Sequence, residues 1–302
     1  MLLVMVIVMD QFLDLRSKYP NFIYHSYKVE DQKDSIKLTY HFEIVGLKDF
    51  YPTIEIPKKD EIDINHEFFS YLVFHIGMME LVSYWKATCS PNIIIHAGYL
   101  NQEQLDWFKK VYYLGLGEFR FLNHIDIDMD SFMTITSIND PSNIEIPEFR
   151  SSGNLIPIGG GKDSNVTLEL LKGFDNYAFI INPKEVTLNC AKIAGYEDKG
   201  IGIRRNIDKN LIELNHAGYL NGHTPFSGIV AFISYLVAFI YQKKYIVLSN
   251  ESSANEATVI GTDINHQYSK SFEFECDFYE YTKKYFKLDI NYFSLLRPLN
   301  EL

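Results

Sequence analysis

The stretch Leu155-Ile-Pro-Ile-Gly159-Gly160-Gly161-Lys162-Asp163-Ser164 decides the fold of the second half of the chain. It reads as a short apolar strand, a bend of three glycines and the start of a helix. Glycine adopts positive φ and lets a ligand approach the backbone closely. The N–H groups at a helix start favour an anion, and Lys162 and Ser164 add a cation and a hydroxyl donor. We therefore predict a phosphate-binding loop over residues 159–164.

Three kinds of phosphate loop compete for this pattern. A Walker A loop, GxxxxGK[ST], fails because Asp163 follows Gly161-Lys162 and Ile156 stands at the leading glycine. A dinucleotide fingerprint, GxGxxG, is a weak match, because it expects an acid where Asn182 ends the next predicted strand. The SGGxDS loop of ATP pyrophosphatases, the PP-loop, matches at all but its first position. A tight turn without a ligand is the remaining interpretation.

Around this loop, short apolar strands alternate with helices. The predicted strands are 155–158, 177–181, 201–203 and 245–248, and the predicted helices begin at Asp163, Pro183, Phe226 and Gln267. Such alternation is typical of a parallel sheet with helices on both faces. Ligands of these sheets bind at the carboxyl ends of the strands, so Asn182, which follows the strand 177–181, is also expected to bind the nucleotide. The expected fold class is α/β, with a parallel-sheet PP-loop domain over residues 151–302.

The first half reads as a mixed α/β domain over residues 1–125, which would serve as the substrate or accessory domain. Strands are predicted at 22–29, 35–45, 53–56 and 93–96, and helices at 66–85 and 103–114. Residues 126–150 are acidic and contain Pro141 and Pro147. We interpret this stretch as the connection between the two domains.

Composition and charge narrow the classes of function. The chain has 302 residues, of which 47% are hydrophobic, and its net charge is −11. Such an acidic surface repels phosphate backbones, so no nucleic-acid partner is expected. Cys89, Cys190 and Cys276 lie far apart and give neither a disulfide framework nor a CxxC metal pair. A reducing, cytoplasmic location fits this pattern.

Two apolar runs bear on membrane association. Met1 to Met9 is only nine residues long, has no basic flank, and is interpreted as a strand or the start of a helix. Phe226 to Tyr241 is also shorter than the roughly 20 residues that span a bilayer. We predict that this second run is a central helix buried on most of its surface, and no membrane partner is expected.

Three polar segments lie next to predicted strands and helices: Asn221-Gly222-His223-Thr224-Pro225, Ser249 to Glu256, and Asn265 to Ser271. Thr224 is predicted to be a helix N-cap, with Pro225 in the first turn. His266 and Lys270 are four residues apart and would share a helix face. Capping and solvated turns are the alternative interpretations, but a ligand-facing role suits the latter two segments better.

The glycine loop and these segments together resemble a known family. The matching motifs are Gly159 to Ser164, Leu220 to Pro225, Ser249 to Asn255 and Asn265 to Ser271, with similar N-terminal stretches at Ser83 to Ala87 and Tyr113 to Phe119. In this order they resemble the UDP-N-acetylmuramoyl-L-alanyl-L-glutamate epimerases of the PP-loop superfamily, over residues 70 to 300. Family chains continue past the region of Ser294 to Leu299, whereas this sequence stops at Leu302, a difference that bears on activity and substrate.

The resemblance implies an ATP-dependent enzyme that inverts a terminal L-glutamate. The substrate carboxylate would attack the α-phosphorus of ATP, and the acyl-adenylate would make the α-proton removable by a base. The implied proton-transfer residues are His223, His266 and Lys270, with Cys190 as a weaker candidate. Asp163 and Glu251 are the implied ligands of Mg²⁺ or Mn²⁺. Substrate contacts are expected from Asn221, Asn250, Glu251, Ser253, Asn265, Gln267 and Ser269.

Two other functions remain open from the sequence. One is an adenylating ligase that forms an amide on another small carboxylate. The other is a nucleotide-binding subunit without catalytic activity of its own. The expected small-molecule partner of the leading hypothesis is a nucleotide-sugar peptide, and the sequence leaves open whether the chain forms a homo-oligomer.

Overall fold

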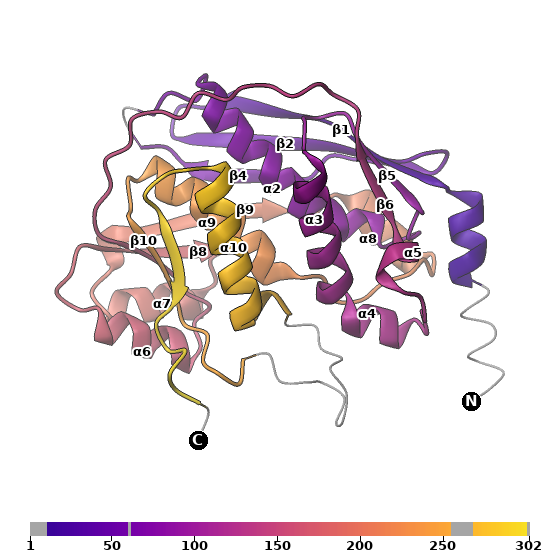
Figure 1. Cartoon of the computed structure of the whole chain (residues 1–302). Coiled ribbons are helices and arrows are strands. Elements are labelled where there is room, and N and C mark those ends of the chain that lie inside the picture. The colour runs from indigo at the N-terminus through magenta and orange to yellow at the C-terminus, as the bar shows by residue number, and fades with distance from the viewer. Residues whose placement is uncertain (1–10, 60–61, 255–267, 301–302) are drawn as a thin grey trace.

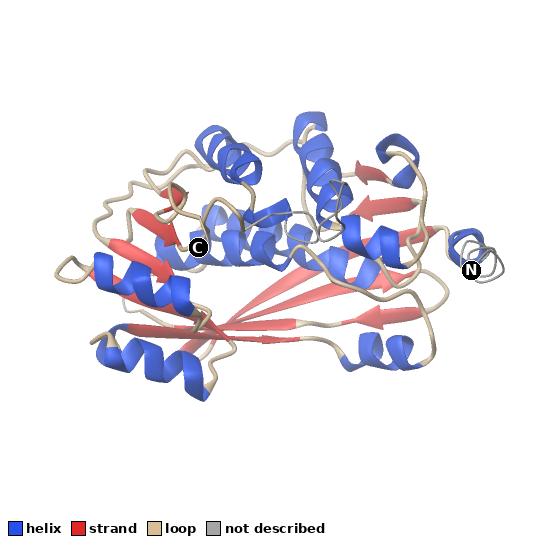
Figure 2. Cartoon of the chain, turned by 90° about the horizontal axis from the view of Figure 1, so that it is seen from below, coloured by secondary structure: helices blue, strands red, loops and turns tan. Residues whose placement is uncertain are grey.

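The structure is a computed structural model that describes residues 11–59, 62–254 and 268–300. Its strands form one mixed sheet of eleven strands in the order β11-β10-β7-β8-β9-β4-β2-β1-β5-β6, with β3 paired to β2 (Figure 1). Helices cover both faces of this sheet (Figure 2). The α/β class expected from the sequence is confirmed, and the sheet is mixed because it joins two parallel sets through antiparallel strands.

The first half of the chain supplies one side of the sheet. β1 (Asn21–Asp31) pairs antiparallel with β2 (Ser35–Ile44), which also pairs antiparallel with β3 (Lys48–Phe50) and β4 (Thr53–Pro57). Every second residue of β2 is buried, so one face of this side joins the core and the other stays polar. β5 (Asn92–Ile95) and β6 (Thr134–Ser137) run parallel to β1.

The second half supplies five strands that all run parallel. They are β7 (Asn154–Pro157), β8 (Asn176–Ile181), β9 (Gly200–Asn206), β10 (Tyr245–Leu248) and β11 (Asn291–Ser294). β9 pairs antiparallel with β4, which connects the two sides. Because β4, β2 and β1 alternate in direction, β5 and β6 run opposite to β7. The carboxyl ends of the two parallel sets therefore lie at opposite edges of the sheet.

Two apolar helices form the centre of the core. α2 (Glu67–Trp85) packs against α9 (Phe226–Ile240), and both contact the sheet. The prediction that the apolar run at 226–241 forms a buried helix is confirmed. α3 (Gln102–Gly115) and α10 (Phe272–Tyr285) contribute Phe108 and Phe278 to the same apolar cluster. No helix in the described part of the chain is both long and apolar enough to cross a membrane.

The other face of the second-half strands has a smaller core. Along β7 and β8, Leu155 and Phe179 join the main cluster, whereas Ile156 and Ile180 point to the opposite face. There they meet residues of α6 (Lys162–Leu170) and α7 (Glu185–Ile193). The other helices of the described residues are one over residues 11–18, α4 (Gly117–Leu122), α5 (Met129–Phe132) and α8 (Lys209–His216), with 3-10 turns at Glu197–Lys199 and Tyr268–Lys270.

Several local predictions need correction. α9 begins at Phe226 with Pro225 as its N-cap residue, so Thr224 does not cap it. Lys270 lies in a 3-10 turn before α10, whose N-cap is Ser271, and His266 lies outside the described residues. The stretch 126–150 contains α5 and β6, and β6 extends the first-half sheet. The division into domains at 125 and 151 stays a prediction.

Candidate active site

The glycine loop joins the carboxyl end of β7 to the start of α6. Gly160 has φ +81°, a conformation that favours glycine, and a Cβ there would make a tight contact of 3.0 Å with Cγ2 of Thr187. Around Gly159 and Gly161 the space that a side chain would fill is open. Gly161 is the N-cap of α6 and no side chain caps that helix. The first N–H groups of α6 are therefore available to an anion.

Charged side chains gather beside the loop. Nζ of Lys162 lies 3.0 Å from Oδ1 of Asp163 and 3.7 Å from Oε1 of Glu251. Glu251 follows β10 and is almost buried, whereas Lys162 is exposed. Sequence analysis named all three residues, and the structure brings them together from segments about ninety positions apart.

The donor set suits a divalent cation only in part. Mg²⁺ prefers oxygen ligands and is commonly held by one or two carboxylates together with substrate phosphates. Asp163 and Glu251 provide two such carboxylates near Lys162. Within the described ranges, no group of three His, Cys, Asp or Glu side chains is placed to hold a metal ion. These carboxylates therefore fit a metal that arrives with a nucleotide better than a metal bound by protein alone.

Arg297 fixes the segments around Glu251. Its guanidinium donates to the carbonyl of Glu251 at 3.0 Å, to the carbonyl of Lys270 at 3.0 Å and to Oε2 of Glu275 at 2.8 Å. Arg297 follows β11, so its side chain connects that segment to the segment after β10 and to the turn before α10. Sequence analysis did not select Arg297, although it lies at the end of the family resemblance.

Of the other residues that were predicted to lie near Glu251, some belong to the described part of the chain and some do not. Asn250 donates from Nδ2 to Oγ of Ser294 at 3.2 Å. Ser269 is buried, and the Oγ of Ser253 is buried without a hydrogen-bond partner among the described residues. Asn265 and Gln267, like His266, lie outside the described residues. Lys270 is half-buried in its turn, and its carbonyl is the group that Arg297 holds.

His223 forms a second group of polar residues with Glu118 and Lys86. Its Nδ1 lies 2.5 Å from Oε1 of Glu118 at the start of α4, a carboxylate that is 12% exposed. Lys86 donates from Nζ to the carbonyl of Gly222, the residue before His223. Asn221 is occupied locally, since its Oδ1 accepts from the N–H of Gly222 at 2.8 Å. A carboxylate on Nδ1 orients an imidazole so that Nε2 can act on a substrate proton.

Sequence reasoning did not select Glu118 or Lys86 as site residues. Both lie in the two N-terminal stretches that contribute to the family resemblance, Tyr113 to Phe119 and Ser83 to Ala87. Burial lowers the pKa of Lys86 to about 8, against an opposing effect of Cys89, and Arg205 lowers it further. A buried lysine with such a pKa can exchange a proton near neutral pH.

Asn182 and Cys190 have structural contacts. Asn182 has φ +50°, and its side chain accepts from the N–H of Arg205 at 2.7 Å and donates to the carbonyl of Arg205 at 3.0 Å. This double contact joins the ends of β8 and β9. The Sγ of Cys190 donates to the carbonyl of Gly160 at 3.7 Å, which supports the glycine bend from α7. The three cysteines are free thiols.

Comparisons with known proteins identify the family. The model of the MurL N-terminal domain matches residues 14–295. Similar curated proteins come from Xanthomonas oryzae pv. oryzae, 35% identical over 226 residues, Micromonospora sp., 33% over 227, and Salinispora tropica, 34% over 227. Each is named UDP-N-acetyl-alpha-D-muramoyl-L-alanyl-L-glutamate epimerase.

These matches cover a larger share of this chain than of the relatives. They cover 73% of this chain but only 49%, 49% and 48% of the relatives, so the chain spans about half the length of the curated relatives it matches. No solved structure matches the chain significantly. Because the family model extends over most of the sequence and both sides of the sheet, the chain belongs to the MurL N-terminal domain family.

Proposed function

We propose that this chain carries the ATP-dependent adenylating centre of a UDP-N-acetylmuramoyl-L-alanyl-L-glutamate epimerase. The match of the MurL N-terminal domain over residues 14–295 carries the proposal, and the relatives bear the name of this epimerase. We further propose that β7 to β11 form a PP-loop domain. The order of strand, glycine bend and uncapped helix at 154–170, with Lys162 beside it, supports this assignment.

In this proposal, residues 159–164 hold the pyrophosphate part of ATP. The N–H groups at the start of α6 and the ammonium of Lys162 would stabilise the leaving pyrophosphate as the substrate carboxylate oxygen bonds to the α-phosphorus. Asp163 and Glu251 would hold the magnesium that accompanies the nucleotide, and this ion would supply charge neutralisation between phosphates. Polar residues of the neighbouring segments, Asn250, Ser253 and Ser269, would contact the substrate, as would Asn265 and Gln267.

Epimerisation then needs a base and an acid on opposite sides of one carbon. The acyl-adenylate has lost the negative charge of the carboxylate, so its α-proton is more acidic. We propose that His223, oriented by Glu118, is one of the two proton-transfer groups, because their 2.5 Å contact holds the ring. His266 and Lys270 remain the candidates for the other group. Water would finally cleave the acyl-adenylate, releasing AMP and the D-glutamyl product.

The phosphate loop is tested through Lys162→Ala. We expect the affinity for ATP and magnesium to fall about tenfold to a hundredfold, because a charge-assisted contact to phosphate is worth about 1.5–3 kcal/mol. Equilibrium binding of ATP, measured by calorimetry, gives the affinity. Lys172→Ala is the matched control, since Lys172 is also exposed near α6 but pairs only with Glu169 among the described residues. Equal affinity of both variants would refute the loop assignment.

The reaction is tested with UDP-N-acetylmuramoyl-L-alanyl-L-glutamate, ATP and magnesium. Exchange of labelled pyrophosphate into ATP that depends on this peptide would report the adenylation step. D-glutamate released after acid hydrolysis would report inversion. An amide that forms only when ammonia or an amine is added would favour the ligase instead. ATP binding without any exchange or AMP would favour the non-catalytic nucleotide-binding subunit.

A further inference from the structure

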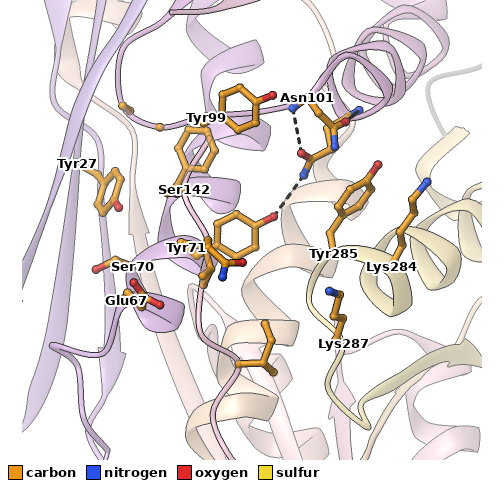
Figure 3. Close-up of a pocket in the computed structure, with 17 residues that line it drawn as sticks. Tyr27, Glu67, Ser70, Tyr71, Tyr99, Asn101, Ser142, Lys284, Tyr285 and Lys287 are labelled. Carbon is orange, nitrogen blue, oxygen red and sulfur yellow. Dashed lines mark hydrogen bonds between the residues drawn. The ribbon is translucent and has the colours of Figure 1, made fainter. Parts of the chain in front are cut away.

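A cavity lies at the carboxyl ends of β5 and β6, and its volume is about 440 Å³ (Figure 3). Most of its lining comes from the first turns of α2, the loop 97–101 after β5, the stretch 142–146 after β6 and the end of α10, and Tyr27 of β1 and Gln104 of α3 complete it. This volume is in the range of cavities that bind small molecules. The position also follows the general rule that ligands bind at the carboxyl ends of parallel strands.

The cavity is separate from the glycine loop. Lys284 and Lys287, which line it, come just before β11 and therefore lie at the amino edge of the second parallel set. The glycine loop follows β7 at the carboxyl edge of that same set. In Figure 1, α6 lies at the lower left, below the upper end of α10 that leads to β11. A ligand here would occupy a site of its own.

A buried chain of hydrogen bonds fixes a donor at the floor of the cavity. Nδ1 of His75 lies 2.8 Å from the carbonyl of Tyr71, which only accepts, so Nδ1 carries a proton. Complete burial lowers the pKa of His75 to about 3, so its Nε2 is bare and accepts from the hydroxyl of Tyr281 at 2.9 Å. The Tyr281 oxygen in turn accepts from Nε2 of Gln104 at 2.9 Å.

The side-chain amide of Gln104 determines that the Tyr71 hydroxyl acts as a hydrogen-bond donor toward the cavity. Its Oε1 accepts from the N–H of Asn101 at 3.1 Å, which confirms that the amide nitrogen points to the tyrosines. This nitrogen also donates to the Tyr71 hydroxyl oxygen at 3.4 Å (Figure 3). The proton of that hydroxyl is thus left for an acceptor in the cavity, since none of the described residues accepts it.

The walls combine aromatic rings with positive charge. Tyr27, Tyr99 and Tyr285 present rings to the cavity, and rings of this kind stack on sugars and bases. Lys284 is neutralised by Glu103, with contacts of 2.5 and 2.6 Å. Lys287 has no ion pair with any described residue, and Figure 3 shows its amine directed to the cavity.

The one acid of the lining is already engaged. The carboxylate of Glu67 accepts from the backbone N–H of Glu145, which holds the stretch 142–146 over the cavity. A free cation, a hydroxyl donor and aromatic walls remain for a ligand. The hydrogen bond does not remove the charge of Glu67, so an anion is favoured only locally, next to the Lys287 ammonium and the Tyr71 hydroxyl.

We propose that this cavity binds a phosphorylated or carboxylated sugar. Its anionic group would meet the Lys287 ammonium and the Tyr71 hydroxyl, and its ring would lie against the tyrosines. The size of the cavity limits the ligand to about a monosaccharide or a mononucleoside. The site is distinct from the proposed nucleotide loop, so it would serve as a second ligand site of this chain.

Titration calorimetry with four probes tests the proposal: glucose 6-phosphate, glucuronate, glucose and inorganic phosphate. The two anionic sugars are expected to bind at least about tenfold more tightly than glucose or phosphate alone, because only they meet both the cation and the rings. Lys287→Met and Tyr71→Phe should each weaken the anionic sugars about tenfold. Both keep the size of the side chain, and circular dichroism verifies that they fold.

Two further variants separate this site from other causes. Lys283→Met is the matched control, because Lys283 is the neighbour of Lys284 on α10 but does not line the cavity, and affinity should not change. Lys162→Ala should also leave sugar binding unchanged, whatever its effect on ATP. The proposal is overturned if glucose binds as tightly as glucose 6-phosphate, if Lys287→Met changes nothing, if Lys162→Ala abolishes binding, or if no anionic sugar binds at about 10 mM.

Discussion

Lys86 shows how burial acts on a single charged residue of the candidate site. Its side chain is 6% exposed at the end of α2, and its ammonium donates to the carbonyl of Gly222. No carboxylate among the described residues pairs with it, so burial dominates and the pKa falls to about 8 from 10.5. The charged form therefore costs folding free energy near neutral pH.

This predicts an unusual pH dependence of stability. Between pH 8 and 10.5 the unfolded chain binds more protons at Lys86 than the folded chain, so the free energy of unfolding rises with pH. We expect the difference between wild type and Lys86→Met to shift in favour of wild type across this window and to stay constant below about pH 7. Urea unfolding at several pH values measures the difference, and a flat difference would contradict the lowered pKa.

The sequence could select single site residues from local patterns, but not the distant residues that they contact. Gly159 to Ser164 form one local pattern, so their role in a loop could be read directly. The contact between His223 and Glu118 joins residues 105 positions apart, and the contact of Lys86 with Gly222 spans 136 positions. Such pairs depend on how α2, α4 and α9 pack, which no local pattern contains.

At the scale of elements, α2 is constrained by its approach to the sheet. Gly77 lies in the middle of this helix, where a Cβ would come within 2.0 Å of Oη and 2.4 Å of Cζ of Tyr24 on β1. The ring of Tyr24 is fully buried, and its hydroxyl donates to the carbonyl of Phe74 at 3.4 Å. Neither group can move away easily, so glycine permits the close contact of helix and strand.

Gly77→Ala should therefore destabilise the protein although alanine favours helices. Alanine gains about 1 kcal/mol of helix propensity, but overpacking of the buried ring costs typically 1–3 kcal/mol. We expect a net loss measured by urea unfolding. Gly228→Ala on α9 is the matched control, because its Cβ would meet Cε of Met79, the flexible end of a side chain, at 2.6 Å. An equal effect of both substitutions would argue against a rigid contact at Tyr24.

The strands and helices that the sequence predicted well are those with a clear period or a long apolar run. The alternation of β2 and the apolar length of α2 and α9 each fix an element without tertiary information. β3, β6 and β11 were missed, since three or four residues are too few to show a period. Their pairing partners, rather than their own residues, determine that they are strands.

At the scale of the whole molecule, a buried ion pair links the two halves of the sequence. Arg205 of β9 contacts Glu80 of α2 through Nε at 2.8 Å and Nη2 at 2.7 Å, and both residues are buried. The same strand β9 pairs with β4 over Thr53 to Glu55. The halves thus share a strand pairing, a bidentate ion pair and the apolar cluster around α2 and α9.

Glu80→Met should lower the free energy of unfolding by about 3–5 kcal/mol, because it leaves the Arg205 guanidinium buried without its partner. The double variant Glu80→Met, Arg205→Met should recover much of this loss, since no unpaired charge remains. Denaturation of the three proteins followed by tryptophan fluorescence gives these values. A double variant as unstable as Glu80→Met would show that the loss comes from packing and not from the unpaired charge.

The sequence could not give the relation between the two parallel sets. Only the second set was visible as alternating strands and helices, since β6 of the first set was missed, and the direction of β4 against β9 depends on three residue pairs. These pairs carry no recognisable motif at Thr53 to Glu55 or Arg204 to Asn206. The cavity beside β5 and β6 was not predicted either, because its lining comes from segments that are far apart in the sequence.

The reversal of strand direction between β9 and β4 determines how ligands of the two proposed sites would enter and leave the protein. A ligand of the proposed glycine-loop site and a ligand of the proposed cavity site would bind at opposite edges of the sheet, so neither would block the entry of the other. Any influence of one on the other would have to pass through α2, α9 and the strands between them as a change of shape or rigidity. Direct steric competition between the two ligands at a shared entrance is therefore not expected.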